Sequence, residues 1–158
     1  MDDKNTYLKK IYMKHALKEA QKAYIKGEVP VGTVIVKAGK IIARAHNLRE
    51  KNNDPTAHAE ILAIKKAAKK LGGWRLTGCD MYVTLEPCAM CAGAIIHSRI
   101  ARLYLGAMDS KAGAAGSILN LFSEDRFNHS VEIESGIMEQ ECSEILKNFF
   151  KSLRKNKI

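Results

Sequence analysis

The sequence has no apolar run long enough to cross a bilayer. Its longest run of apolar and small residues, Cys88–Ile96, is about half the roughly 20 residues that a membrane-spanning helix needs. Near its beginning, Asp2, Asp3 and Lys4 are followed by an amphipathic segment and not by the apolar core of a secretory signal. We therefore expect a cytoplasmic protein without a membrane partner.

The sequence also lacks internal repeats, low-complexity tracts and any stretch with the composition of a linker. Its 158 residues are the size of one ordinary domain. Apolar residues make up 46% of the chain and charged residues 27%, which is normal for a globular protein. We therefore expect a single domain over residues 1–158.

Cysteine is scarce, with only Cys79, Cys88, Cys91 and Cys142 in the chain. Two disulfides are formally possible. In a cytoplasmic protein, however, a close Cys-x-x-Cys pair is more often metal-binding or redox-active than structural. The Cys88–Cys91 pair is therefore the first candidate for chemistry.

Negative charge is in deficit, and the formal net charge is +9 at pH 7. A basic balance of this size favours polyanionic partners, nucleic acid first. A solvated, lysine-rich surface explains the same number. Charge alone leaves both interpretations open.

Hydrophobic periodicity predicts helices and strands in the order α-β-β-α-β-α-β-β-α. The predicted helices are Tyr7–Lys26, a segment that follows the candidate N-cap Thr56 and ends at Gly72, Pro87–Ile96, and a segment from Gly136 onward. The predicted strands are Val31–Val36, Ile41–Ala45, Asp80–Leu85, Ile100–Leu105 and Val131–Ile133. The residues expected on the buried side of the last helix are Ile137, Met138, Cys142, Ile145, Leu146, Phe149, Phe150 and Leu153. This order predicts an α/β protein: a three-layer α/β/α sandwich with a five-stranded mixed sheet and helices on both faces.

Two short segments, each at the start of a predicted helix, combine the residue types that bind zinc. Cys88 and Cys91 are three residues apart and share one helix face, where the helix dipole favours thiolates. His58 opens another helix and can meet them from across the fold. Three protein ligands leave the fourth tetrahedral position for water, as in catalytic zinc sites. Glu60, two residues after His58, is placed for general acid–base catalysis on that water.

The alternative is a closed structural zinc site, which needs a fourth protein ligand. An extended Asp80–Leu85 strand displaces Cys79 by roughly 20 Å from the pair. Cys142 falls on the apolar stripe of the last helix, and His97 falls at the far end of the helix that begins near Cys88. The sequence therefore favours the open, catalytic site.

From about Tyr7 to about Arg154, the chain resembles the bacterial tRNA-specific adenosine deaminases, a family with a cytidine deaminase-like fold. The segments Asp54–Glu60 and Thr84–Cys88 are similar to the metal segments of that family. Asp109–Ser117 is similar to the substrate loop of its RNA-acting members. The pairs Asn128-His129 and Phe149-Phe150 fit the same branch.

The resemblance implies hydrolysis of adenosine to inosine at the wobble position of a tRNA anticodon loop, with one zinc ion per chain. It implies that His58, Cys88 and Cys91 hold the zinc and that Glu60 shuttles protons. It further implies that the protein acts as a homodimer on the anticodon stem-loop. The residues implied to contact substrate are Asn47, which hydrogen-bonds the flipped base, Pro87, whose backbone faces the leaving amine, Asp109, Asn128 and Phe149.

Simpler interpretations stay open for several of these residues. Asn47 alone is a typical turn residue, and 113–117 alone is a typical flexible connector. Phe149 and Phe150 are adjacent on a helix, so one of them is expected in the core. The basic C-terminal residues fit either phosphate contact or a solvated helix end.

Two other functions remain open at the level of sequence. A deaminase of a free base or nucleoside, of guanine or cytosine type, would share the zinc site and differ in its pocket. A non-catalytic RNA-binding protein with a structural zinc would have no use for Glu60.

Overall fold

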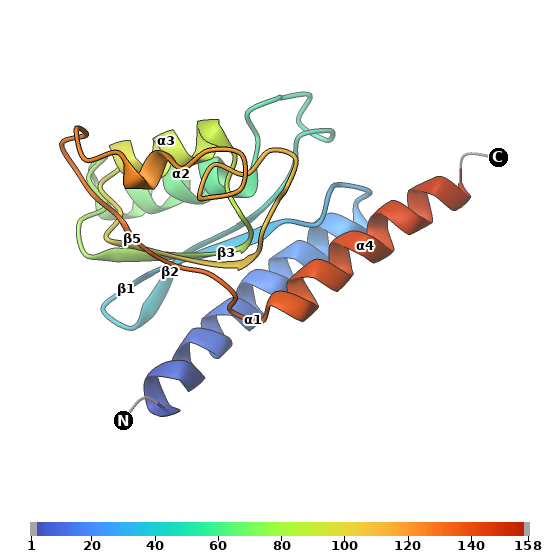
Figure 1. The fold of residues 1–158 in the computed structure, drawn as a ribbon, viewed down its shortest axis with the longest axis horizontal. Coiled ribbons are helices and arrows are strands. Elements are labelled where there is room, and N and C mark those ends of the chain that lie inside the picture. The colour runs from blue at the N-terminus through green and yellow to red at the C-terminus, as the bar shows by residue number, and fades with distance from the viewer. Residues whose placement is uncertain (1–2, 157–158) are drawn as a thin grey trace.

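The computed structural model describes residues 3–156 and arranges them in three layers (Figure 1). The helices are α1 (Asp3–Ile25), α2 (Ala59–Leu71), α3 (Ala89–His97) and α4 (Glu139–Lys155), with a short 3₁₀ helix η1 (Leu121–Ser123). The strands are β1 (Gly32–Lys37), β2 (Lys40–His46), β3 (Cys79–Leu85), β4 (Arg102–Ala107) and β5 (Glu132–Glu134). The predicted order of helices and strands is confirmed.

The five strands form one mixed sheet in the order β2-β1-β3-β4-β5. Strand β1 pairs antiparallel with β2 and with β3, whereas β3, β4 and β5 run parallel. The parallel step from β3 to β4 requires a crossover, and α3 supplies it. The predicted three-layer sandwich with a five-stranded mixed sheet is therefore confirmed.

Alternation along the strands divides the core into two halves, one on each face of the sheet. Ile35, Met81 and Leu103 belong to a cluster that includes apolar residues of α2 and α3. The neighbouring residues Val34 and Tyr82 belong to a second cluster with residues of α1 and α4. Figure 1 shows α2 and α3 above the sheet and α1 and α4 below it. Helices therefore cover both faces, as predicted.

Some boundaries differ from the predicted ones for local reasons. Strand β4 begins at Arg102, where its pairing with Asp80 of β3 starts, two residues after the predicted Ile100. Helix α4 begins only at Glu139, because Met138 has a left-handed backbone with φ of 54°, which a helix does not accommodate. The prediction of Thr56 as the N-cap of α2 was wrong. The N-cap is His58, and the Thr56 amide and hydroxyl both donate to the Asp54 carboxylate.

The predicted buried side of α4 is correct for its first turns and wrong for its end. Cys142 and Phe149 are buried, but Phe150 and Leu153 are 42% and 43% exposed. Figure 1 shows that the C-terminal end of α4 projects beyond the sheet, so this part of the helix has no strand to cover. Among residues 3–156, no helix has the length and apolar character needed to cross a membrane.

Gly32, the first residue of β1, allows the backbone of α1 to approach the sheet closely. A Cβ atom at this position would lie 2.0 Å from the carbonyl oxygen of Ala16 and 2.4 Å from the amide nitrogen of Ala20. Both atoms belong to the helix backbone, so no rotamer change relieves the overlap. Gly32 thus sets the spacing between α1 and β1, the strand that follows the Val29–Val31 segment.

We predict that Gly32→Ala lowers the free energy of unfolding by about 2 kcal/mol or more, because helix and strand must separate to admit the methyl group. Urea unfolding followed by circular dichroism measures this change. Gly73→Ala is the matched control, since no heavy atom lies within 4 Å of a Cβ built there. Equal stability of the two variants would contradict the proposed packing constraint.

Candidate active site

Three candidate metal ligands meet where α2 and α3 begin. His58 is the N-cap of α2, and Cys88 is the N-cap of α3. Cys91 lies one turn into α3 and is fully buried. Neither N-cap side chain makes the usual capping hydrogen bond, and both face the space between the two helix starts, where the His58 ring meets the two sulfurs.

The distances among these groups fit a tetrahedral metal. The Nδ1 atom of His58 lies 3.6 Å from the Cys88 Sγ and 3.5 Å from the Cys91 Sγ. Zinc bonds of about 2.3 Å to sulfur and 2.0–2.1 Å to nitrogen, at tetrahedral angles, place such atoms about 3.6 Å apart. The side chains present therefore fit a zinc ion without rearrangement of the site.

The two thiols differ strongly in acidity. A hydrogen bond from Cys91 and another with His58 lower the pKa of Cys88 to about 3, against the opposing effect of burial. The bond to Cys88 and burial raise the pKa of Cys91. Cys88 is thus a thiolate that Cys91 stabilises, and a cation bound between them would take the place of the shared proton.

Glu60 lies in the first turn of α2 and is buried beside this cluster. Burial raises the pKa of its carboxyl group to about 7. A carboxyl group with a pKa near neutrality can both accept and donate a proton at physiological pH. The sequence spacing predicted that Glu60 lies near His58. Only the burial of Glu60 in the fold explains why its pKa is raised.

A cavity of about 180 Å³ opens in front of His58, Glu60 and Cys88. Its other walls include Val29, Val31, Asn47, Arg49, Leu85, Glu86, Asp109 and Ala112. The volume is below the roughly 300–1,000 Å³ of pockets that enclose drug-sized ligands. A single planar ring system fits this space better than a whole nucleotide.

Three of the residues expected to contact substrate lie at this cavity or beside it. Asn47 and Asp109 line it. The Asn47 side chain accepts from the Arg49 amide at 3.2 Å and donates to the Val29 carbonyl at 3.2 Å, so it also shapes its own turn. Pro87 is buried next to Cys88, and its carbonyl accepts from the Ala114 amide at 2.8 Å.

The two other expected substrate contacts lie elsewhere. Asn128 is exposed on the loop before β5 and is not part of the cavity wall. The Phe149 ring is buried against Tyr24 of α1, with the ring centroids 5.5 Å apart. A buried ring offers no surface to a substrate, so the expectation for Phe149 needs correction. The exposed member of the pair is Phe150.

No fourth ligand closes the metal cluster among residues 3–156. Cys79 lies at the opposite end of β3 from Cys88, and Cys142 packs in the core between the sheet and α4. His97 is exposed at the end of α3. The arrangement favours an open site over a closed structural one.

Sequence reasoning missed two buried glutamates that shape the cavity from its loops. Glu28 accepts hydrogen bonds from the backbone amides of Glu50 and Lys51, at 3.0 and 2.7 Å. Glu86 accepts from the 109–117 loop. Burial raises the pKa of Glu86, but the bonds from the Ser117 hydroxyl and three amides outweigh this and lower it. The available signal was a carboxylate beside apolar residues: Glu86 directly follows β3, and Glu28 precedes the Val29–Val31 segment that leads into β1.

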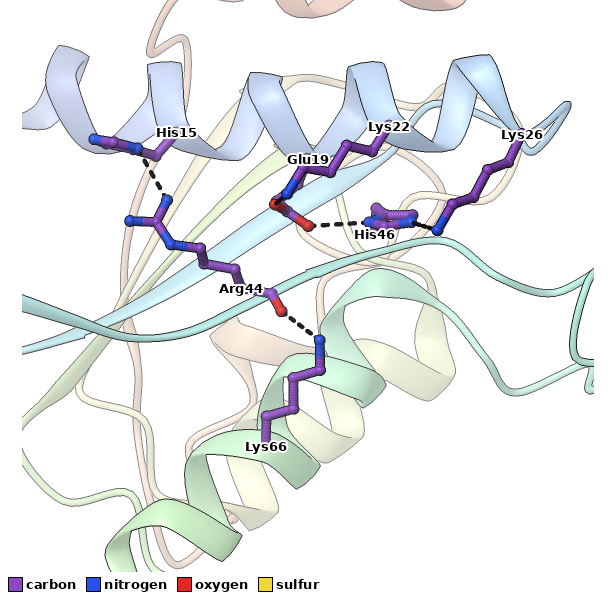
Figure 2. Close-up of polar contacts among 7 residues, drawn as sticks. All are labelled: His15, Glu19, Lys22, Lys26, Arg44, His46 and Lys66. Atoms are coloured by element: carbon purple, nitrogen blue, oxygen red, sulfur yellow. Dashed lines mark hydrogen bonds and ion pairs between the residues drawn. The ribbon is translucent and has the colours of Figure 1, made fainter.

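A chain of polar contacts ties α1 to the end of β2, next to Asn47 (Figure 2). His46 contacts Glu19 through Nδ1 at 3.0 Å and Lys26 through Nε2 at 2.9 Å, and Glu19 also accepts from Lys22 at 2.7 Å. Because an ammonium group only donates, Nε2 is the acceptor and Nδ1 carries the proton. The chain fixes the strand end from which Asn47 enters the cavity.

The sequence matches one family model and relatives that share one name. Residues 8–154 match the family model of the MafB19-like deaminases. The chain is 56% identical to the tRNA-specific adenosine deaminase of Bacillus subtilis, over 93% of this chain and 91% of the relative. It is 51% identical to the enzyme of the same name from Aquifex aeolicus, over 94% and 97%.

Solved structures agree with these sequence relatives. A chain from structural studies of A-to-I editing by tRNA:A34 deaminases at the wobble position superposes with a TM-score of 0.83 and 50% identity, covering 85% of this chain and 98% of that one. The guanine deaminase from Nitrosomonas europaea superposes with a TM-score of 0.75 at 22% identity, covering 89% and 83%. The second likeness shows the shared fold alone.

The polar chain in Figure 2 makes stability depend on acidity. Burial alone raises the pKa of Glu19, but hydrogen bonds from His46 and Lys22 outweigh it and lower the pKa below 4.5. The stability that Glu19 contributes is therefore present above about pH 4.5 and is lost as the pH falls through the lowered pKa.

We predict that Glu19→Gln is less stable than the wild type by about 1–3 kcal/mol at pH 7, and that the difference shrinks below about pH 4.5. Urea unfolding at a series of pH values measures it. Glu134→Gln, in an exposed ion pair with Lys9, is the control and should cost little at any pH. A pH-independent difference for Glu19→Gln would show that its charge is not involved.

Proposed function

This chain belongs to the tRNA-specific adenosine deaminases, within the MafB19-like deaminases, and we propose that it hydrolyses adenosine to inosine at the wobble position of a tRNA anticodon loop. One observation carries the proposal: the His58 Nδ1 lies 3.5–3.6 Å from two cysteine sulfurs, beside a buried carboxyl group at a cavity sized for one base.

In this proposal His58, Cys88 and Cys91 hold one zinc ion per chain and leave the fourth position open. When bound, zinc lowers the pKa of a water molecule and so supplies the nucleophile. The imidazole and thiolate donor set suits zinc better than metals that prefer carboxylate and carbonyl oxygens.

Glu60 is the proposed proton shuttle. Its carboxylate takes a proton from the attacking water and delivers it to N1 of adenine, while oxygen adds to C6. Glu60 then takes the remaining proton of the hydroxyl group added at C6 and passes it to the exocyclic amine. The C6–N6 bond breaks as the C6=O double bond forms, and ammonia and inosine are the products. Burial raises the pKa of the Glu60 carboxyl group, which favours the protonated form that each delivery of a proton requires.

The remaining cavity residues position the base. Asn47 keeps one amide hydrogen beyond its bond to Val29 and can donate it to a flipped base. The Pro87 backbone, next to Cys88, is proposed to face the leaving amine, and Asp109 forms part of the cavity wall. Flipping a base out of a single-stranded loop costs little free energy, because little stacking is lost.

The proposed partner is the anticodon stem-loop of a tRNA, which suits a chain of net charge +9. Arg49 on the cavity wall and the basic end of α4 offer phosphate contacts. Asn128, outside the cavity, and Phe150, the exposed member of its pair, belong to this outer surface. We further propose that the protein acts as a homodimer in the cytoplasm, where its tRNA substrate occurs.

The proposal predicts inosine in a tRNA anticodon stem-loop with adenosine at the wobble position after incubation with the zinc-loaded protein. Free adenosine, cytidine and guanine should stay unconverted under the same conditions. Glu60→Gln keeps the size of the side chain and removes the titratable group. We expect it to reduce turnover by a factor of about 100 or more, which is the usual contribution of general acid–base catalysis.

Inosine formed equally well by Glu60→Gln would remove the carboxyl group from the mechanism. Conversion of a free base or nucleoside, with the stem-loop untouched, would keep the hydrolytic chemistry and overturn the RNA substrate. RNA binding by the wild type without turnover would favour a non-catalytic zinc protein.

Metal content provides an independent prediction. The wild type should contain about one zinc per chain, and Cys88→Ala should lose most of it, because two ligands hold zinc far less tightly than three. Cys142→Ala is the matched control, since this cysteine lies in the core between the sheet and α4. Mass spectrometry of the native protein or plasma emission measures the content. Unchanged zinc content in Cys88→Ala would show that Cys88 is not a zinc ligand.

A further inference from the structure

One buried carboxylate holds most of the loop that forms a wall of the cavity. Glu86, only 2% exposed, accepts from the backbone amides of Asp109 at 2.8 Å, Ala115 at 2.9 Å and Ser117 at 3.0 Å. The Ser117 hydroxyl also donates to it. Four donors from a single loop thus converge on the two oxygens of one side chain.

The loop wraps closely around this carboxylate. At Gly113, a Cβ atom would lie 2.2 Å from the Glu86 carboxyl carbon and from one of its oxygens. The next residue, Ala114, donates its amide to the Pro87 carbonyl. The 109–117 loop is therefore fixed to the turn that joins β3 to α3, the same turn that presents Cys88.

The loop forms part of the cavity wall, whereas the proposed chemical groups come from other segments. Asp109 and Ala112 line the cavity, but His58 and Glu60 belong to the start of α2. Displacement of the loop would change the shape of the cavity while leaving the proposed proton shuttle in place. The loop that Glu86 holds thus shapes the space for the base without itself contributing a candidate metal ligand or the proposed proton shuttle.

We propose that Glu86 is a positioning residue that holds the 109–117 loop against the base and so determines how tightly the RNA substrate binds. The proposal rests on the function proposed above. Glutamine at this position has the same size, but its NH₂ group faces loop donors that need an acceptor. The Ser117 hydroxyl can reverse its role and accept, but a backbone amide cannot, so at least one amide hydrogen bond is lost. The loop then no longer has a fixed position at the cavity.

We predict that Glu86→Gln raises KM for the anticodon stem-loop by about tenfold or more, as expected from the loss of charge-assisted hydrogen bonds, and changes kcat by less than about threefold. Zinc content should stay near that of the wild type. Ser117→Ala, which removes only the hydroxyl bond, should have a smaller effect in the same direction. A loss confined to kcat, with KM unchanged, would overturn the positioning role.

A double-mutant cycle separates positioning from general destabilisation. Gly113→Ala should raise KM in the wild-type background, where the new methyl group collides with the carboxylate. In the Glu86→Ala background the collision is gone, so the same change should have a much smaller effect. Additive effects of the two changes would show that Gly113 and Glu86 are not coupled, against the proposal.

Hydrogen exchange tests the loop without any activity measurement. In the zinc-loaded wild type, the amides of Asp109, Ala115 and Ser117 should be protected, and in Glu86→Gln they should exchange at least tenfold faster. If the wild type proves inactive on the stem-loop while this difference is found, the proposed function fails and the anchoring of the loop stands. Equal exchange in both proteins would overturn the anchoring itself.

Discussion

The whole site depends on the start of α2 lying beside the start of α3. His58 and Cys88 are N-caps, so their side chains emerge where each helix begins and not from a helix face. The packing of α2 and α3 on one face of the sheet brings these two caps together. The parallel step from β3 to β4 puts α3 on that face, and the close approach of α1 at Gly32 occupies the other. A shift of one helix by a single turn, about 5.4 Å, would separate the nitrogen from both sulfurs.

Buried glutamates make up the rest of the site, and their surroundings give them opposite properties. Glu86 is supplied with hydrogen-bond donors, so its pKa is lowered and it remains an ionised anchor. Glu60 is buried without such a set of donors, and its pKa rises to about 7. The same side chain is thus a fixed acceptor at one position, while at the other its raised pKa suits the proton transfer proposed for Glu60. Glu28 repeats the anchoring arrangement on the loop that leads from Asn47.

The sequence predicts the layers and the chemical groups well, because both leave local signals. Alternation in the strands and helical periodicity determine which faces are buried, and His-x-Glu with Cys-x-x-Cys picks out three side chains that lie close enough to hold a metal ion. The ends of helices and strands were harder to predict from the sequence. Met138 in a left-handed conformation and the cap at His58 in place of Thr56 depend on contacts with distant residues. The exposure of Phe150 and Leu153 depends on how far α4 projects beyond the sheet, which periodicity does not encode.

The anchoring role of Glu86 was hidden for a related reason: its partners lie 23 to 31 residues further along the chain. A carboxylate in an apolar strand end signals that donors must exist somewhere, because an unpaired buried charge is costly. The sequence does not say which loop supplies them. The donors come from the 109–117 loop, which contributes none of the three candidate metal ligands, so changes in this loop can alter the wall without replacing a ligand. The fold by itself therefore does not determine the substrate, and a guanine deaminase shares this fold.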